Sequence, residues 1–201
     1  MKIILGTAHG SNVAGKRSPD GRLLEYRYSR EIVARVEKAL QAEGYDVTVD
    51  LRQDYEPSLA VRVQMVNNLC RKYGARNCCY VSIHVNAAGC GGWYGASYWT
   101  VWTSRGQTQG DKLARALYDA ACNRLRPLGK MVRGDWGDGD PDFEANFYVL
   151  RKTLCAAALT ENMFMDCRAD VDWLLTEEGK QAIVDLHVEG IKKYVNEQLK
   201  A

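Results

Sequence analysis

Four side chains in this sequence could together bind a metal ion and transfer protons. Three of them, His9, His84 and Glu161, stand at the end of a short apolar run or just beyond it, and Glu25 is the fourth. The three runs are Ile3–Leu5, Cys79–Ile83 and Ala156–Leu159. Two imidazoles and two carboxylates are a set of groups that suits a zinc hydrolase.

The apolar runs indicate how residues so far apart could meet. Runs of this length are typical of buried strands in a parallel sheet. In open α/β sheets, ligands bind in the crevice beyond the carboxyl ends of the strands. We therefore expect His9 in the loop after the first strand, His84 at the end of the third, and Glu25 just ahead of the first helix.

Each residue taken alone also has a structural explanation. The spacing is long, and the compact His-Glu-x-x-His helix motif of many zinc enzymes is absent. A histidine near the end of a sheet is as often a hydrogen-bonded structural residue. A glutamate at a helix start is more often there because carboxylates are stabilised at that position.

The elements that must position these residues alternate along the chain. We expect a single α/β domain over 1–201, with a mainly parallel twisted sheet of about six strands and helices on both faces. The expected strands are 2–7, 46–51, 78–84, 93–102 and 155–161, the expected helices are 29–43, 58–74, 108–125 and 177–199, and residues 134–146 form a polar loop.

Composition excludes several classes of protein. The net charge of +2 gives no electrostatic case for nucleic acid or an anionic membrane. No apolar run approaches the roughly 18 residues needed to cross a bilayer, and residues 1–6 lack the features of a signal peptide. The seven cysteines are odd in number and form no Cys-x-x-Cys pair, so we expect reduced thiols and synthesis in the cytoplasm.

Several local motifs resemble those of the zinc-dependent N-acetylmuramoyl-L-alanine amidases, which cleave bacterial cell walls. The similarity spans most of the chain, and Ser82-Ile83-His84-Val85-Asn86-Ala87 is its most specific part, because it matches the family's Ser-Ile-His-x-Asn-Ala motif. The other similar segments are Ala8-His9-Gly10, Glu25, Asp54 to Asn67 with Arg62, and Leu159 to Phe164. The chain departs from the family at Gly6-Thr7-Ala8, which replaces Asp-x-Gly, and lacks the proline before the catalytic segment.

The resemblance implies a role for each candidate residue. It implies one Zn²⁺ ion held by His9, Glu25 and His84, with Glu161 as the catalytic carboxylate, and it makes Asn86 a candidate for substrate binding. The implied substrate is bacterial peptidoglycan, cut at the amide between N-acetylmuramic acid and L-alanine of the stem peptide. We expect a monomeric phage or prophage lysin with no separate wall-binding module and no membrane insertion, which acts at the cell wall after release.

Two rival functions stay open. The same ligands would serve a zinc peptidase or deacetylase with another substrate. A non-catalytic wall-binding protein could keep the fold without the chemistry, although a pure binder needs no general base such as Glu161.

Three other features are interpreted as structural. His187 lies on the apolar stripe of the last helix, and Cys90 lies in a glycine-rich turn. The aromatic segment 93–102 is explained mainly by core packing, and a wall for stacking sugars is the alternative.

Overall fold

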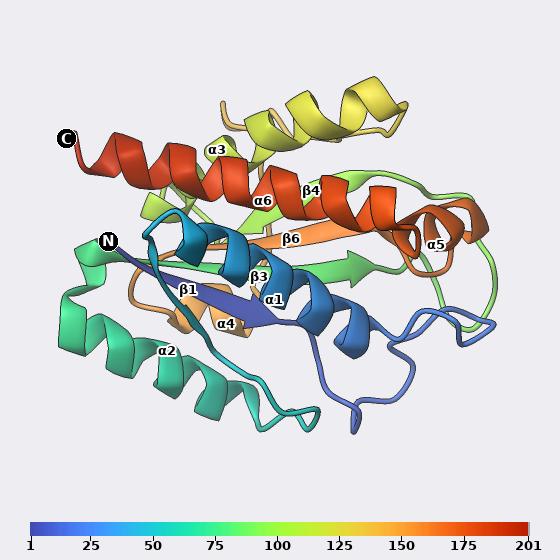
Figure 1. Cartoon of the computed structure of the whole chain (residues 1–201), viewed down its shortest axis with the longest axis horizontal. Coiled ribbons are helices and arrows are strands. Elements are labelled where there is room, and N and C mark those ends of the chain that lie inside the picture. The colour runs from blue at the N-terminus through green and yellow to red at the C-terminus, as the bar shows by residue number, and fades with distance from the viewer. Residues whose placement is uncertain (201) are drawn as a thin grey trace.

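A six-stranded sheet runs through the middle of the computed structural model, which describes residues 1–200 (Figure 1). The strands are β1 Lys2–Thr7, β2 Asp46–Val49, β3 Cys78–Asn86, β4 Trp99–Thr103, β5 Phe143–Glu144 and β6 Ala156–Phe164. Their order across the sheet is β2-β1-β3-β6-β4-β5. The first four in that order are parallel, and β4 pairs with β6 in the antiparallel direction. The predicted mainly parallel sheet is confirmed.

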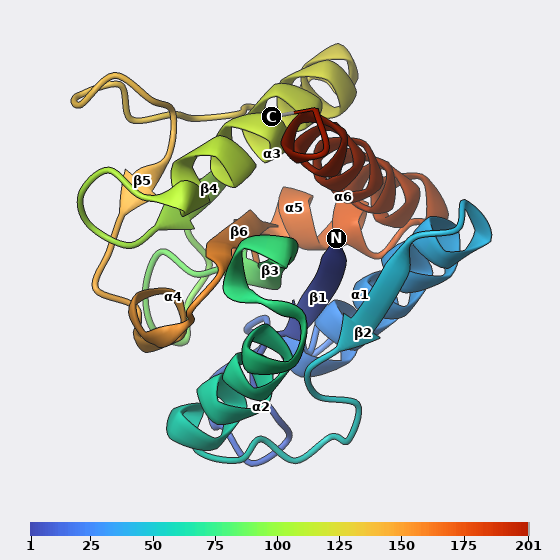
Figure 2. The ribbon, with the colours of Figure 1, turned by 90° about the vertical axis from the view of Figure 1, so that its left-hand side faces the viewer.

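Helices cover both faces of this sheet (Figure 2). On one face lie α1 Glu25–Ala42, α3 Gln109–Leu125 and α6 Glu177–Gln198, and on the other lie α2 Leu59–Tyr73 and α4 Tyr148–Lys152. The remaining helical segments are α5 Arg168–Leu174 and the short 3-10 turns Ala75–Asn77 and Arg126–Leu128. Of the helices described here, none is both long enough and apolar enough to cross a membrane.

Burial on both faces explains why the inner strands are continuous apolar runs. Every residue of β1 is buried. Ile3 and Leu5 pack into the larger core under α1, α3 and α6, whereas Ile4 packs with Tyr80 and Val66 in a smaller core under α2. Alternate side chains therefore enter two different cores, so the inner residues Ile3, Ile4 and Leu5 are all apolar.

Helix starts follow local capping chemistry. The Ser58 hydroxyl accepts a hydrogen bond from Val61 N at 3.4 Å, and Thr108 forms a capping box with Asp111. The first helix starts at Glu25, four residues earlier than the expected start at 29. Buried Tyr28 extends the stripe of Ile32, Val36 and Leu40 by one turn toward the amino end, and Glu25 is itself the first helical residue.

The expected strand 93–102 is only half correct, because β4 begins at Trp99. The backbone before it is held by a carboxylate and by a neighbouring loop. The Asp166 carboxylate accepts hydrogen bonds from Ala88 N and Gly89 N at 2.8 and 2.9 Å, and Tyr94 N donates to Asp166 O at 2.7 Å. The expected loop 134–146 is also only partly correct, because it contains the short strand β5.

Candidate metal centre and active site

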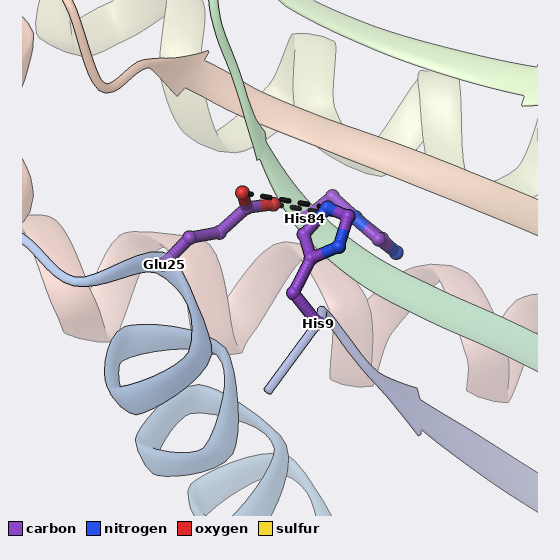
Figure 3. Close-up of side chains that lie close together, drawn as sticks. All are labelled: His9, Glu25 and His84. Carbon is purple, nitrogen blue, oxygen red and sulfur yellow. Dashed lines mark hydrogen bonds and ion pairs between the residues drawn. The ribbon is translucent and has the colours of Figure 1, made fainter. Parts of the chain in front are cut away.

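His9, Glu25 and His84 meet near the carboxyl ends of β1 and β3, where they point toward one another (Figure 3). One donor atom from each lies within 4.8 Å of the donor atoms of the other two. Glu25 Oε2 is 3.6 Å from His9 Nε2, and Glu25 Oε1 is 3.2 Å from His84 Nδ1. The convergence expected from the sequence is confirmed for these three residues.

The backbone of His9 has an unusual conformation. Its φ is 42°, in the left-handed region that residues other than glycine rarely adopt. The loop is held there by Ala8 N, which donates to Ser29 Oγ at 2.8 Å, and by Ser11 N, which donates to Asp54 O at 2.7 Å. A Cβ at Gly10 would lie 2.3 Å from Glu56 N, so only glycine permits this close approach. Strain of this kind is found where the surrounding structure fixes a functional residue.

The Glu25 and His84 pair is arranged for a neutral imidazole and an ionised carboxylate. Burial lowers the pKa of His84 and thus favours its neutral form. Burial opposes ionisation of Glu25, but the hydrogen bond from His84 and the nearby imidazoles lower the pKa of Glu25. A neutral His84 that donates Nδ1–H to Glu25 Oε1 leaves Nε2 to accept from the Ser82 hydroxyl, 3.0 Å away. To bind a metal through Nδ1, His84 would take the other tautomer, in which Nε2–H donates to Ser82 Oγ and the Nδ1 lone pair faces the ion.

Sequence reasoning missed Glu56, whose carboxylate faces the ring nitrogen of His9 that is turned away from Glu25. Glu56 Oε2 is 3.7 Å from His9 Nδ1, and Glu56 Oε1 accepts from Arg62 Nη1 at 2.8 Å. Burial would raise the pKa of Glu56, but His9 and Arg62 together lower it to about 2. Arg62 also pairs with the buried Asp50 at 2.8 Å. The only signal in the sequence was Arg62 at one helical turn into α2, and it did not identify its partner.

Glu161 lies next to His84 on the neighbouring strand. The two residues are in register in the parallel pair β3 and β6, so their side chains leave the same face of the sheet. Glu161 Oε2 is buried and has no hydrogen-bond partner. Burial raises the pKa of Glu161 well above its usual value, and the negative charge of Glu25 raises it further. A buried carboxyl group of raised pKa beside a candidate metal site is a candidate general acid or base.

The other residues singled out in the sequence lie apart from this cluster. Asn86 is two residues beyond His84 on β3, half-buried, and its Oδ1 accepts from Ala87 N at 2.8 Å. Cys90 is exposed and free, as the other six cysteines are also free. His187 is fully buried in α6 on the opposite face, as its place on an apolar stripe indicated.

The fold and the site together define an α/β domain whose candidate metal ligands gather near the carboxyl ends of the strands. Residues 3–193 match the Amidase_3 family, described as N-acetylmuramoyl-L-alanine amidase, and the chain belongs to that family.

Individual relatives support the same assignment. The chain is 27% identical over 194 residues to the endolysin of Bacillus phage SPP1. That match covers 96% of this chain but only 66% of the endolysin, so this chain spans about two thirds of its relative's length.

Solved structures share the fold. The amidase AmiC2 of Nostoc punctiforme superposes with a TM-score of 0.81 at 23% identity and covers 98% of this chain and 97% of its own. An N-acetylmuramoyl-L-alanine amidase from Clostridium difficile 630 gives 0.79 at 23% identity, with 97% and 96% covered. The predicted family and fold are confirmed.

Proposed function

We propose that this protein is a zinc-dependent N-acetylmuramoyl-L-alanine amidase. It would hydrolyse the amide between the lactyl group of N-acetylmuramic acid and L-alanine of the stem peptide. The observation that carries the proposal is the meeting of His9, Glu25 and His84 beside Glu161 in a chain of this family. The match to a phage endolysin favours a lysin that acts on the bacterial wall.

The donor set fits one zinc ion. Two imidazole nitrogens and a carboxylate are a known catalytic set that leaves a fourth position open. Glu25 Oε2 is buried and lacks a hydrogen-bond partner. Coordination of a cation would satisfy this oxygen. Zinc, when bound, lowers the pKa of a water ligand to about 7 and polarises a carbonyl group.

The role proposed for Glu161 is proton transfer. In its ionised form it would accept the proton of the attacking water, and in its protonated form it would return a proton to the amine of L-alanine as the amide bond breaks. Burial and the charge of Glu25 raise the pKa of Glu161, which favours the protonated form that the second step needs. Asn86, farther along the same strand, is proposed to contact the substrate.

The products would decide between this proposal and its rivals. We would digest purified cell walls with the protein, measure its metal content, and analyse the products by mass spectrometry. An amidase releases new L-alanine amino ends and no new reducing sugars. Acetate release would indicate a deacetylase, cuts within the stem would indicate a peptidase, and binding of glycan without products by the zinc-loaded protein would indicate a binder.

A further inference from the structure

The face of the sheet that carries Glu161 continues across the next strand. Glu161 pairs with Thr100 in the antiparallel ladder between β6 and β4, so both side chains leave the same face. Tyr98 precedes β4 by one residue and lies on that face as well, because alternate residues share a side. Figure 2 shows β4 beside β6, with β5 beyond it.

Arg133 lies at the far edge of this face. Val132 forms a parallel bridge with Trp99, and both pack into the opposite core, so the neighbouring Arg133 side chain leaves on the side of Tyr98 and Glu161. Its guanidinium stacks over the Tyr98 ring at 5.2 Å and over the Phe143 ring at 5.6 Å. Among residues 1–200 it forms no ion pair with a carboxylate, and the residue is exposed.

These contacts orient a planar positive charge without neutralising it. Two aromatic rings restrict the guanidinium while its N–H groups stay free to bind a ligand. A guanidinium held in this way is suited to a carboxylate, which it can bind through two parallel hydrogen bonds.

The distance to Glu161 indicates which carboxylate. Two strand spacings separate β6 from the segment that carries Arg133, roughly 10 Å. An extended peptide covers about 3.3–3.6 Å per residue, so this span corresponds to two or three residues beyond the scissile amide. We propose that Arg133 binds a free carboxylate near the second residue of the stem peptide and thereby selects substrates by charge. This inference rests on the proposed amidase function.

The test compares two soluble substrates that differ in one charge. Both consist of N-acetylmuramic acid, L-alanine and D-glutamate, and the α-carboxylate of D-glutamate is free in one and amidated in the other. The wild-type protein should prefer the free acid by roughly 10- to 100-fold in kcat/KM, mostly through KM, as expected for a charged hydrogen bond. In Arg133→Gln the preference should vanish, because only hydrolysis of the free acid becomes slower.

A second arginine provides the matched control. Arg151 is also exposed and stacks on a tyrosine, at 6.0 Å from Tyr148, but it lies in α4 beside the amino end of β6. Arg151→Gln should keep the wild-type preference. Equal losses on both substrates in Arg133→Gln, or no preference in the wild type, would overturn the proposal.

Calorimetric binding of the two compounds separates this inference from the proposed function. If the zinc-loaded protein cleaves neither compound but Arg133 still discriminates between them in binding, the amidase proposal fails and the carboxylate site stands. If wild type and Arg133→Gln both cleave the two compounds at equal rates, the amidase proposal stands and the carboxylate site at Arg133 fails.

Discussion

Adjacent residues on β6 enter two polar clusters of opposite character. Thr160 points toward α6, where its hydroxyl lies 2.8 Å from His187 Nε2, and His187 Nδ1 lies 2.7 Å from Ile183 O. Glu161 points to the other face, where its Oε2 is buried without a partner. Both clusters contain an imidazole, but only the cluster around His187 is fully buried and satisfies its hydrogen-bonding groups within the protein.

The difference separates a structural histidine from a candidate functional one. Buried polar groups in native proteins are almost always hydrogen-bonded, so each unpaired atom needs an explanation. The cluster at the strand ends has two, Glu25 Oε2 and Glu161 Oε2. The cluster around His187 stabilises the fold. The cluster around Glu25 and Glu161 leaves buried oxygens unpaired, which destabilises the fold, and binding of a cation and a substrate would offset that loss.

The largest expected effect comes from removing a ligand. His84→Ala should lose both bound zinc and all measurable amidase activity, because two donors cannot replace three. Metal content by mass spectrometry and turnover of cell walls check this together. A variant that keeps one zinc per chain with near-normal turnover would contradict the ligand set.

Glu161→Gln should separate catalysis from metal binding. We expect activity to fall roughly 10²- to 10⁴-fold, the range typical for a general acid–base residue. Zinc content should stay at the wild-type level, and the free energy of unfolding should not decrease, since a buried carboxyl group without a partner is replaced by a neutral amide. Near-normal turnover would refute the role of Glu161.

A smaller effect is expected at Glu56, which contacts His9. Glu56→Gln should weaken zinc binding by about 10- to 100-fold, the usual effect of losing the carboxylate that orients a histidine ligand. Asp54→Asn is the matched control, because Asp54 lies two residues away and pairs only loosely with Arg30, at 3.8 Å. Competition with a zinc-binding dye measures both variants. Equal affinities would mean that Glu56 serves Arg62 alone.

Sequence reasoning located the candidate ligands because strand ends are visible as the ends of apolar runs. His84 and Glu161 follow such runs, and their neighbouring positions follow from the pairing of β3 with β6. The sequence could not show the antiparallel direction of β4, because a short strand next to a long loop can join a sheet either way. It could not show Glu56 or Arg133 either, since both depend on contacts between loops distant in sequence.

The last prediction concerns the satisfied cluster and its dependence on pH. Burial lowers the pKa of His187 from 6.5 to about 4. Between these values the unfolded chain binds a proton that the folded chain does not, so stability falls as the pH is lowered from 6.5 to 4. The loss from His187 amounts to about 3 kcal/mol at most. His187→Gln keeps a donor and an acceptor but cannot titrate, so its urea-denaturation free energy should fall less than that of the wild type over this range. Since the two proteins differ only at this position, the difference between the two curves reports His187, and superimposable curves would show that burial does not lower the pKa of His187.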